Sequence, residues 1–361
     1  MPNLFGKEQH TALSALAAAQ AIAFAPYVFH TSLLLRDWGI LKLLADARPD
    51  GLSLSDVAAA MPQYSHYALR VLLEGGLGIG LLLRDDAGNY HQSKTGHFFA
   101  NDRMTIVNTD FMRDVCLPGA ADLESSLKEG RPTGLRHFGE WSTIYEGLSS
   151  LPPEIQQSWF AFDHFYSDIA FPIALEYVFD SGNAPRRLLD IGSNTGKWAL
   201  AVLNHTPDVH IGLVDLPGQL SMAVEKLLNT GYSTSRFSAH PHNVLDNDLS
   251  LPTGYDAIWM SQFLDCFSDS EIVDILRKCH AALPDDGRVF INETFWDRQR
   301  FQASAFSLQM TSLYFTTMAN GNSQMYESDV FLALIRQADF RILNQTDNIG
   351  MGHTLLTLIK A

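Results

Sequence analysis

The stretch that decides the fold is residues 188–196, Leu-Leu-Asp-Ile-Gly-Ser-Asn-Thr-Gly, which is followed by a helical pattern from Lys197. The aliphatic residues predict a buried strand, and the glycines predict a tight turn. A second aliphatic strand, residues 209–214, ends at Asp215. Strand, glycine turn, helix and strand in this order predict a parallel βαβ unit.

The alternation of strands and helices continues to the end of the chain. Further strands are expected at 235–240, 257–261, 288–293, 340–344 and 353–359, and helices at 219–228, 269–283 and 328–338. This pattern predicts a doubly wound α/β sheet with an antiparallel end. Such sheets bind ligands at the carboxyl ends of their strands, where Gly192, Asp215, Asn243, Gln262 and Glu293 fall.

The glycine turn and Asp215 favour an adenosine cofactor. Glycines let the backbone approach a ligand, and a carboxylate at the end of the second strand accepts hydrogen bonds from ribose hydroxyls. The pattern from Asp190 to Gly196 is Asp-x-Gly-x-x-x-Gly, not Gly-x-Gly-x-x-Gly. We therefore expect a cofactor without a pyrophosphate, which argues against an NAD-dependent dehydrogenase.

The first hundred residues predict a winged helix. Helices are expected at 11–24, 27–45, 53–60 and 67–74, and short strands at 81–84 and 89–92. The first helix is apolar on nearly all sides and must be buried, either within its own domain or against a second copy of the chain. We expect this module to serve dimerisation.

The charge of the chain argues against nucleic acid as a partner. The sequence holds 25 basic and 40 acidic side chains, a formal net charge of -15. The expected recognition helix offers Arg70 alone, and the hairpin tip carries Asp85 and Asp86. Because phosphate backbones repel such a surface, a transcription factor is the weaker alternative.

The cysteines and histidines predict neither disulfides nor a metal site. The three cysteines are far apart, and His240, His242 and His280 lack a tight set of partner ligands. No stretch approaches the roughly twenty apolar residues that span a bilayer. We expect a cytoplasmic protein without a membrane partner.

Residues 190–196, the triplet Asp215-Leu-Pro217 and the helix opening at 267–271, Phe-Ser-Asp-Ser-Glu, together resemble the plant-type and bacterial small-molecule O-methyltransferases. The resemblance covers nearly the whole chain. It implies a winged-helix dimerisation domain at 1–100, a helical linker roofing the acceptor pocket at 101–180, and a Rossmann-like methyltransferase domain at 181–361. It further implies a homodimer that uses S-adenosylmethionine and releases S-adenosylhomocysteine.

The resemblance also implies the cofactor residues. Gly192 is expected near the methionine part of the cofactor, Asp215 at the ribose and Leu216 on the adenine. Asn243 stands where the family usually has Asp, and Ser261 where Lys is common. The full expected set is Asp190, Gly192, Asn194, Asp215, Leu216, Asn243, Val244, Ser261 and Gln262.

The expected catalytic residues depart from the family. The family's base is a His within Leu-His-Asp-Trp, whereas residues 264–267 here are Leu-Asp-Cys-Phe. Asp265 then needs a raised pKa, or else it only orients the acceptor. Glu293 matches an acidic residue that orients the family's His, and Gln324 replaces a second one. We hypothesise that His164 supplies the missing imidazole; the alternative is a structural histidine packed among aromatic residues.

The acceptor is expected to be small, flat and largely apolar. O-methylation of a phenol or aromatic acid in secondary metabolism is the leading hypothesis. C- or N-methylation on the same scaffold and cofactor binding without turnover are the alternatives. The residues expected to shape the acceptor pocket, besides His164, are Phe160, Phe165, Trp296, Phe306, Met310 and Tyr314.

Overall fold

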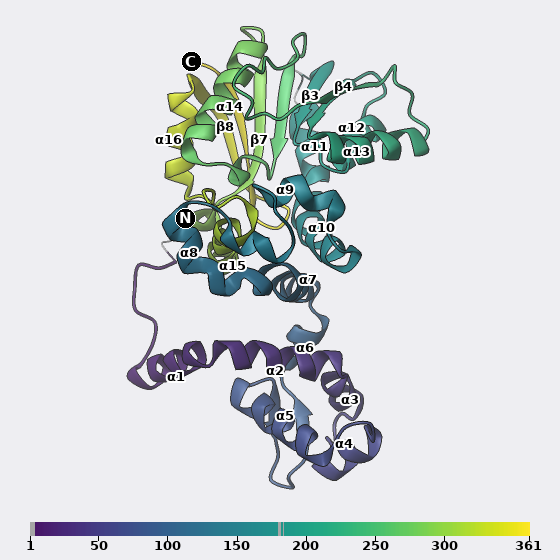
Figure 1. Ribbon diagram of the computed structural model, residues 1–361, viewed down its shortest axis with the longest axis vertical. Coiled ribbons are helices and arrows are strands. Elements are labelled where there is room, and N and C mark those ends of the chain that lie inside the picture. Colours follow the sequence, from purple (N-terminus) through teal and green to yellow (C-terminus); the bar gives the residue numbers. More distant parts are fainter. Residues whose placement is uncertain (1–3, 180–181, 183) are drawn as a thin grey trace. The chain divides into compact units, whose positions relative to one another are not determined.

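The computed structural model describes residues 4–179, 182 and 184–361. The chain divides into two compact units, Phe5–Asp110 and Phe111–Ala361. Figure 1 shows helices in the first unit and a helix-covered sheet in the second. We describe each unit by itself.

The first unit contains the helices and the hairpin that the sequence predicts. Its elements are α1 (Ala12–Ala23), α2 (Ala25–Asp37), α3 (Ile40–Asp46), α4 (Leu54–Ala60), α5 (His66–Ile79), β1 (Leu82–Arg84), β2 (Tyr90–Gln92), α6 (Lys94–Asn101) and the start of α7 (Arg103–Phe111). Ser53 begins α4 with a capping box to Asp56. The strands β1 and β2 pair antiparallel.

Two helix boundaries in this unit differ from the sequence prediction, and both involve glycines. The prediction of a single helix at 27–45 is wrong. Gly39 adopts a left-handed φ of 82° and separates α2 from α3. Conversely, α5 continues past Gly75, Gly76 and Gly78 and ends only at Gly80. Helical packing of Leu72 and Leu73 into the core of this unit outweighs the low helix propensity of the glycines.

The second unit is built on a seven-stranded sheet, as predicted. Its strand order is β5-β4-β3-β6-β7-β9-β8. The strands are β3 (Arg187–Ile191), β4 (His210–Asp215), β5 (Phe237–Pro241), β6 (Ala257–Ser261), β7 (Arg288–Thr294), β8 (Phe340–Ile349) and β9 (His353–Lys360). The first five pair parallel, and β9 pairs antiparallel with β7 and β8. The expected antiparallel end is therefore confirmed.

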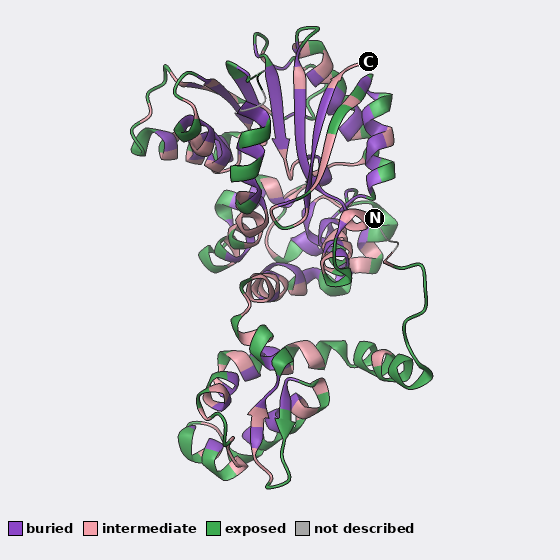
Figure 2. Cartoon of the chain, turned by 180° about the vertical axis from the view of Figure 1, so that it is seen from behind, coloured by how far each residue is buried: buried purple, intermediate pink, exposed green. Residues whose placement is uncertain are grey.

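Helices cover both faces of the sheet (Figure 1). One apolar core lies under α14 (Asp269–Ala282) and α16 (Ser328–Gln337). The other lies under α11 (Phe171–Phe179), α12 (Lys197–His205) and α13 (Pro217–Asn229). The inner strands β3, β4, β6, β7 and β9 are mostly buried (Figure 2), as expected for strands covered on both faces, whereas the edge strands β5 and β8 are largely half-buried or exposed.

A segment of short helices precedes the sheet. It comprises η1 (Met112–Cys116), η2 (Leu117–Asp122), α8 (Leu123–Glu129), η3 (Thr133–His137), α9 (Ile144–Gly147), η4 (Leu148–Ser150), α10 (Pro153–Ser167) and η5 (Asp168–Ala170). The sequence prediction left out α15 (Gln302–Tyr314) and the π-helix η8 (Phe315–Ala319) that follows it.

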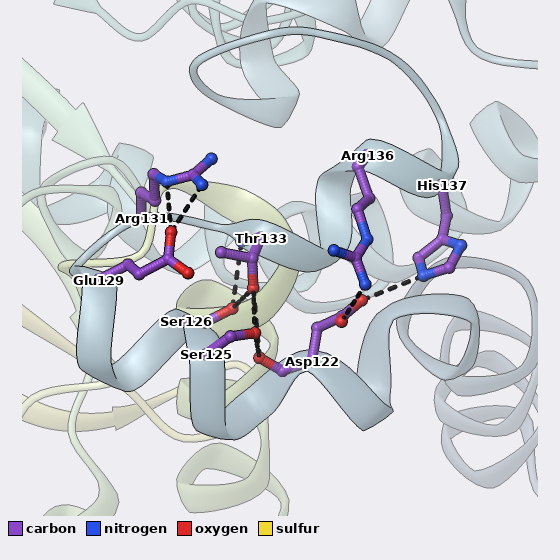
Figure 3. A network of polar contacts seen from close by, with 8 residues as sticks. All are labelled: Asp122, Ser125, Ser126, Glu129, Arg131, Thr133, Arg136 and His137. Carbon is purple, nitrogen blue, oxygen red and sulfur yellow. Dashed lines mark hydrogen bonds and ion pairs between the residues drawn. The ribbon is translucent and has the colours of Figure 1, made fainter.

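A polar network fastens the turn between α8 and η3 (Figure 3). Arg136 donates to Asp122 Oδ1 at 2.6 Å, and the His137 ring nitrogen lies 3.0 Å from Asp122 Oδ2. Thr133 shares hydrogen bonds with the hydroxyls of Ser125 and Ser126 at 2.8 and 2.7 Å. Because this turn packs against η8, the network fixes the position of helical residues that border the cavity described below.

The helix α1 has no buried residue (Figure 2). Its Leu13 and Ile22 are 81% and 76% exposed. In the described part of the chain, no single helix is long and apolar enough to cross a membrane, although the bent pair of α1 and α2 passes that test by length and composition.

We predict opposite stability effects for two glycine-to-alanine changes in the first unit. A Cβ added to Gly39 or to Gly78 meets nothing within 4 Å, so only backbone effects act. Gly39→Ala should destabilise the unit by about 1 kcal/mol, because alanine disfavours positive φ. Gly78→Ala should stabilise it by about 0.5–1 kcal/mol, because alanine is the better helix former. Chemical denaturation followed by circular dichroism measures both, and a shift of the same sign in both variants would contradict the explanation of the break at Gly39.

Candidate active site

A cavity of about 290 Å³ lies in the second unit, at the carboxyl ends of the sheet strands. All nine residues expected to bind the cofactor line it: Asp190, Gly192, Asn194, Asp215, Leu216, Asn243, Val244, Ser261 and Gln262. They come from four strands or from the loops that follow them. The topology therefore brings this whole set together at one edge of the sheet.

The glycine turn is locked to the end of β4 by the Asp215 carboxylate. Asp215 Oδ2 accepts a hydrogen bond from the Asn194 backbone N–H at 2.7 Å, and Oδ1 accepts one from the Leu216 N–H at 2.7 Å. Burial is the main cause that raises the pKa of Asp215 to about 6, and the two backbone N–H groups oppose that rise. The carboxylate is thus fixed in position and held close to the cavity.

Gly192 cannot be replaced without moving its neighbours. It has a φ of 79°, and a Cβ at this position would lie 2.3 Å from the Phe263 ring. Two other lining residues, Asn194 and Gln262, have φ angles of 48° and 46°, which non-glycine residues rarely adopt. Backbone strain of this kind gathers at ligand sites.

Several buried polar atoms of this set have no hydrogen-bond partner among the described residues. They are Asp190 Oδ2, Asn194 Oδ1 and Gln262 Oε1. Buried polar atoms are normally paired, and a missing partner indicates a ligand or water. These acceptors, together with the glycine turn, fit a cofactor that carries ribose hydroxyls and an amino group.

The expected catalytic residue Asp265 also lines the cavity. It lies in the short helix η6 (Leu264–Cys266) and is 4% exposed. Burial raises the pKa of Asp265 to about 7, with Asp163 adding to the rise, while the Cys266 thiol, 3.5 Å from Asp265 Oδ1, opposes it. At neutral pH this carboxyl group can therefore exchange a proton, which an ordinary aspartate does poorly.

Glu293 lies behind this helix and does not line the cavity. Its Oε1 accepts hydrogen bonds from the backbone N–H groups of Phe263 and Leu264, both at 2.9 Å. Burial, followed by the charge of Asp265, raises the pKa of Glu293 well above its usual range. In this structure Glu293 therefore holds the loop that carries Asp265.

His164 lines the cavity from α10, on the side of the glycine turn. Its Nε2 lies 3.2 Å from Thr195 Oγ1, and its Nδ1 lies 3.5 Å from carboxylate oxygens of Asp163 and Asp168. No hydrogen bond joins it to Asp265 among the described contacts. Gln324 is exposed and lies outside the lining.

Aromatic side chains form much of the remaining wall. They are Phe111, Tyr145, Trp159, Phe162, Tyr314 and Phe315. Trp159 Nε1 donates to the Tyr314 hydroxyl at 2.7 Å, and the rings of Phe111 and Phe162 stack at 4.0 Å. These contacts give the wall a fixed, mostly apolar surface suited to a flat acceptor.

Only Tyr314 of the six residues expected to shape the acceptor pocket lines this cavity. The other five, Phe160, Phe165, Trp296, Phe306 and Met310, lie outside the lining. On α15, Phe306 and Met310 are 57% and 38% exposed, whereas Tyr314, on the same side of the helix near its end, is 6% exposed. Sequence reasoning missed Phe111 and Tyr145 because neither belongs to a motif.

The described residues contain no group of three or more His, Cys, Asp or Glu side chains that could hold a metal ion.

Comparison with known proteins identifies related methyltransferases. The sequence model of the Dimerisation2-like domain matches residues 17–90, and that of the O-methyltransferase domain matches residues 174–341. The L-tyrosine C(3)-methyltransferase of Streptomyces lavendulae is 24% identical over 281 residues, which is 75% of this chain and 72% of that protein. The demethylspheroidene O-methyltransferase of Cereibacter sphaeroides is 26% identical over 70% of this chain and 64% of its own length.

A solved structure shares the fold over nearly the whole chain. The S-adenosylmethionine-dependent methyltransferase SibL superposes with a TM-score of 0.69 at 24% identity, covering 96% of this chain and 99% of SibL. The two domain models match the chain in the order that the resemblance in the sequence implies. The chain belongs to the S-adenosylmethionine-dependent O-methyltransferase family that carries an N-terminal dimerisation domain.

Proposed function

We propose that the chain transfers the methyl group of S-adenosylmethionine to an oxygen atom of a small aromatic acceptor. The observation that carries this proposal is the single cavity that joins the nine expected cofactor residues to Asp265 and an aromatic wall. The cofactor supplies an activated methyl group on a sulfonium. The work left to the protein is to align acceptor and methyl group and to exclude water.

Each cofactor residue has a proposed role. The Asp215 carboxylate accepts from the ribose hydroxyls, and Leu216 and Val244 pack on the adenine. Asn243, whose Oδ1 already accepts from the Leu245 N–H at 3.0 Å, faces the adenine edge. Gly192 and Asn194 approach the methionine part, with Asp190 behind them. The Ser261 hydroxyl, which accepts from Asn292 Nδ2 at 2.9 Å, and Gln262 border the cofactor from the end of β6.

Asp265 is the proposed proton acceptor for the hydroxyl of the acceptor. Its pKa of about 7 is close to neutral pH, whereas the pKa of an unperturbed aspartate is about 4. A general base works best when its pKa is close to the working pH. Glu293 positions the loop of Asp265 through the two backbone N–H groups it holds. We assign His164 to the cofactor side, because its ring contacts Thr195 of the glycine turn.

Carbon methylation is the second candidate. The absence of a His at position 265 and the name of the first relative above, a C(3)-methyltransferase, both favour it. A nucleophilic ring carbon activated by its own hydroxyl needs the same alignment and a weaker base.

We further propose that two copies of the chain associate through α1. The Dimerisation2-like domain model begins within this helix, at residue 17. Its apolar residues Leu13, Leu16 and Ile22 are exposed in the single chain. Exposed apolar patches of this kind mark interaction surfaces.

Light scattering after size exclusion tests the association. The wild-type chain should elute as a dimer, and a variant combining Leu13→Asp and Ile22→Asp should elute as a monomer, since buried aspartates oppose association. Leu343→Asp on β8 is the control, because Leu343 is also exposed, at 51%, but lies in the other unit. A monomeric wild type, or a dimer in the double variant, would rule out association through α1.

Cofactor binding should depend on the charge of Asp215. Because its pKa is about 6, the carboxylate is ionised at pH 7.5 and mostly protonated at pH 5. Calorimetric titration with S-adenosylhomocysteine should therefore give a Kd about tenfold weaker at pH 5 than at pH 7.5. Asp215→Asn should bind at least tenfold more weakly at pH 7.5 and lose this pH dependence, while the exposed Asp286→Asn should behave as wild type. Unchanged binding in Asp215→Asn would refute the ribose assignment.

The rate of methyl transfer should depend on the protonation state of Asp265. If Asp265 accepts the proton, the rate should rise with pH up to about 7 and then level off, because the carboxylate is the active form. Asp265→Asn should lower kcat by about 10²–10⁴ and leave the Kd for S-adenosylhomocysteine unchanged. A rate in Asp265→Asn close to that of wild type would show that Asp265 does not accept the proton.

The stability of the same variant provides a check on the pKa. The folded pKa of Asp265 is raised, so its contribution to stability is present below the unfolded pKa of about 4 and is lost as the pH rises to about 7. The unfolding temperature of Asp265→Asn relative to wild type should therefore increase between pH 4 and pH 7. If the difference in unfolding temperature between the two proteins stays constant from pH 4 to pH 7, the pKa of Asp265 is not raised in the folded protein.

A further inference from the structure

Asp163 is a carboxylate in the cavity that neither the family motif nor the acceptor set includes. It lies on α10, one turn before the end of that helix, and lines the cavity. Its side chain is 21% exposed. A charged group in such a place is costly unless something compensates for it.

The contacts of Asp163 place it against the glycine turn. Asn194 Nδ2 donates to Asp163 Oδ2 at 2.8 Å, and the backbone N–H of the same asparagine donates to Asp215. Asp163 is thus joined through one residue to the carboxylate assigned to the ribose. Its charge also contributes to raising the pKa values of Asp215, Asp265 and Tyr314. Asp163 therefore acts on both the cofactor side and the acceptor side of the cavity.

The basic side chains near Asp163 also contact a second carboxylate, that of Asp168. Lys197 Nζ donates to Asp168 Oδ2 at 2.5 Å, and His164 Nδ1 lies 3.5 Å from both Asp163 and Asp168. The carboxyl groups of Asp190, Asp215 and Asp265 also line the cavity. A positive charge bound between Asp215 and Asp265 would therefore meet a negative field with Asp163 close by.

The methyl donor places a positive charge in that position. In S-adenosylmethionine the sulfonium is attached to the ribose and carries the methyl group that faces the acceptor. If Asp215 holds the ribose and Asp265 faces the acceptor, the sulfonium lies between them. We propose that Asp163 attracts this sulfonium and so lets the cavity distinguish the charged cofactor from its neutral-sulfur product. This inference rests on the function proposed above.

The reaction itself removes the attraction. An acceptor lone pair forms the new bond to the methyl carbon, and the electron pair of the breaking S–CH₃ bond stays on sulfur. The acceptor proton passes to Asp265 or to solvent. S-adenosylhomocysteine then has an uncharged thioether beside Asp163, so the product loses a contact that the substrate cofactor had. Asp163 acts by charge and forms no bond.

A purely structural role for Asp163 is the alternative, because the residue also holds Asn194. Asp163→Asn separates the two roles. The amide oxygen of asparagine can still accept from Asn194 Nδ2, so the shape of the turn is kept while the charge is lost. Asp163→Glu keeps the charge and should retain part of the discrimination.

The test compares three ligands by calorimetric titration of the full chain. They are S-adenosylmethionine, S-adenosylhomocysteine and sinefungin, which carries an ammonium in place of the methylated sulfonium. Asp163→Asn should weaken binding of the two ligands charged at this position about tenfold and change binding of S-adenosylhomocysteine less than about twofold. The control is Glu154→Gln, which removes an exposed carboxylate from the first turn of the same helix and should change none of the three.

Each outcome decides the inference. Equal weakening of all three ligands in Asp163→Asn overturns it, because that pattern means contact with the α-ammonium that all three share, or loss of the turn. Unchanged binding of all three also overturns it. If wild type binds none of them, the methyltransferase function itself fails, and that result differs from either pattern seen in the variant.

Discussion

The two hydrogen bonds that Asp215 accepts hold the candidate site together. One comes from the Asn194 N–H in the glycine turn and the other from the Leu216 N–H at the start of α13. They join the segment after β3 to the segment after β4, which only parallel pairing brings side by side. Hydrogen bonds to a charged acceptor are stronger than those between neutral groups. The Asp215 carboxylate therefore holds the glycine turn in its left-handed conformation without a ligand.

That constraint determines what surrounds the carboxylate. Because both oxygens of Asp215 accept hydrogen bonds from backbone N–H groups, the carboxylate stays fixed in a buried position. This burial raises the pKa of Asp215. Asp190, Asp163 and Asp265 line the same cavity, and burial raises the pKa of each of them as well. So many buried carboxyl groups are unfavourable in the free protein. The arrangement is understandable if a cationic ligand relieves their repulsion on binding.

The sequence predicted the sheet because strand and helix patterns are local, and for the same reason the nine residues expected to bind the cofactor line one cavity. Aliphatic strands, glycine turns and the acidic residue at the end of β4 recur at spacings that any parallel sheet brings together. It failed for the acceptor wall, because Phe111, Tyr145 and Trp159 lie in helices whose rotation depends on tertiary packing. The exposure of Phe306 and Met310 and the break at Gly39 could not be inferred from residue type, because both depend on tertiary packing.

The replacement of the family's His by Asp265 is best explained by the surroundings of that position. Glu293 Oε1 accepts from two backbone N–H groups of the loop that carries Asp265, while its Oε2 has no hydrogen-bond partner among the described residues. The aspartate at this position is shorter than a histidine. Burial and the charge of Asp163 raise its pKa. The charge of Asp163, which we propose attracts the cationic methyl donor, thus also helps to raise the pKa of Asp265 to about 7.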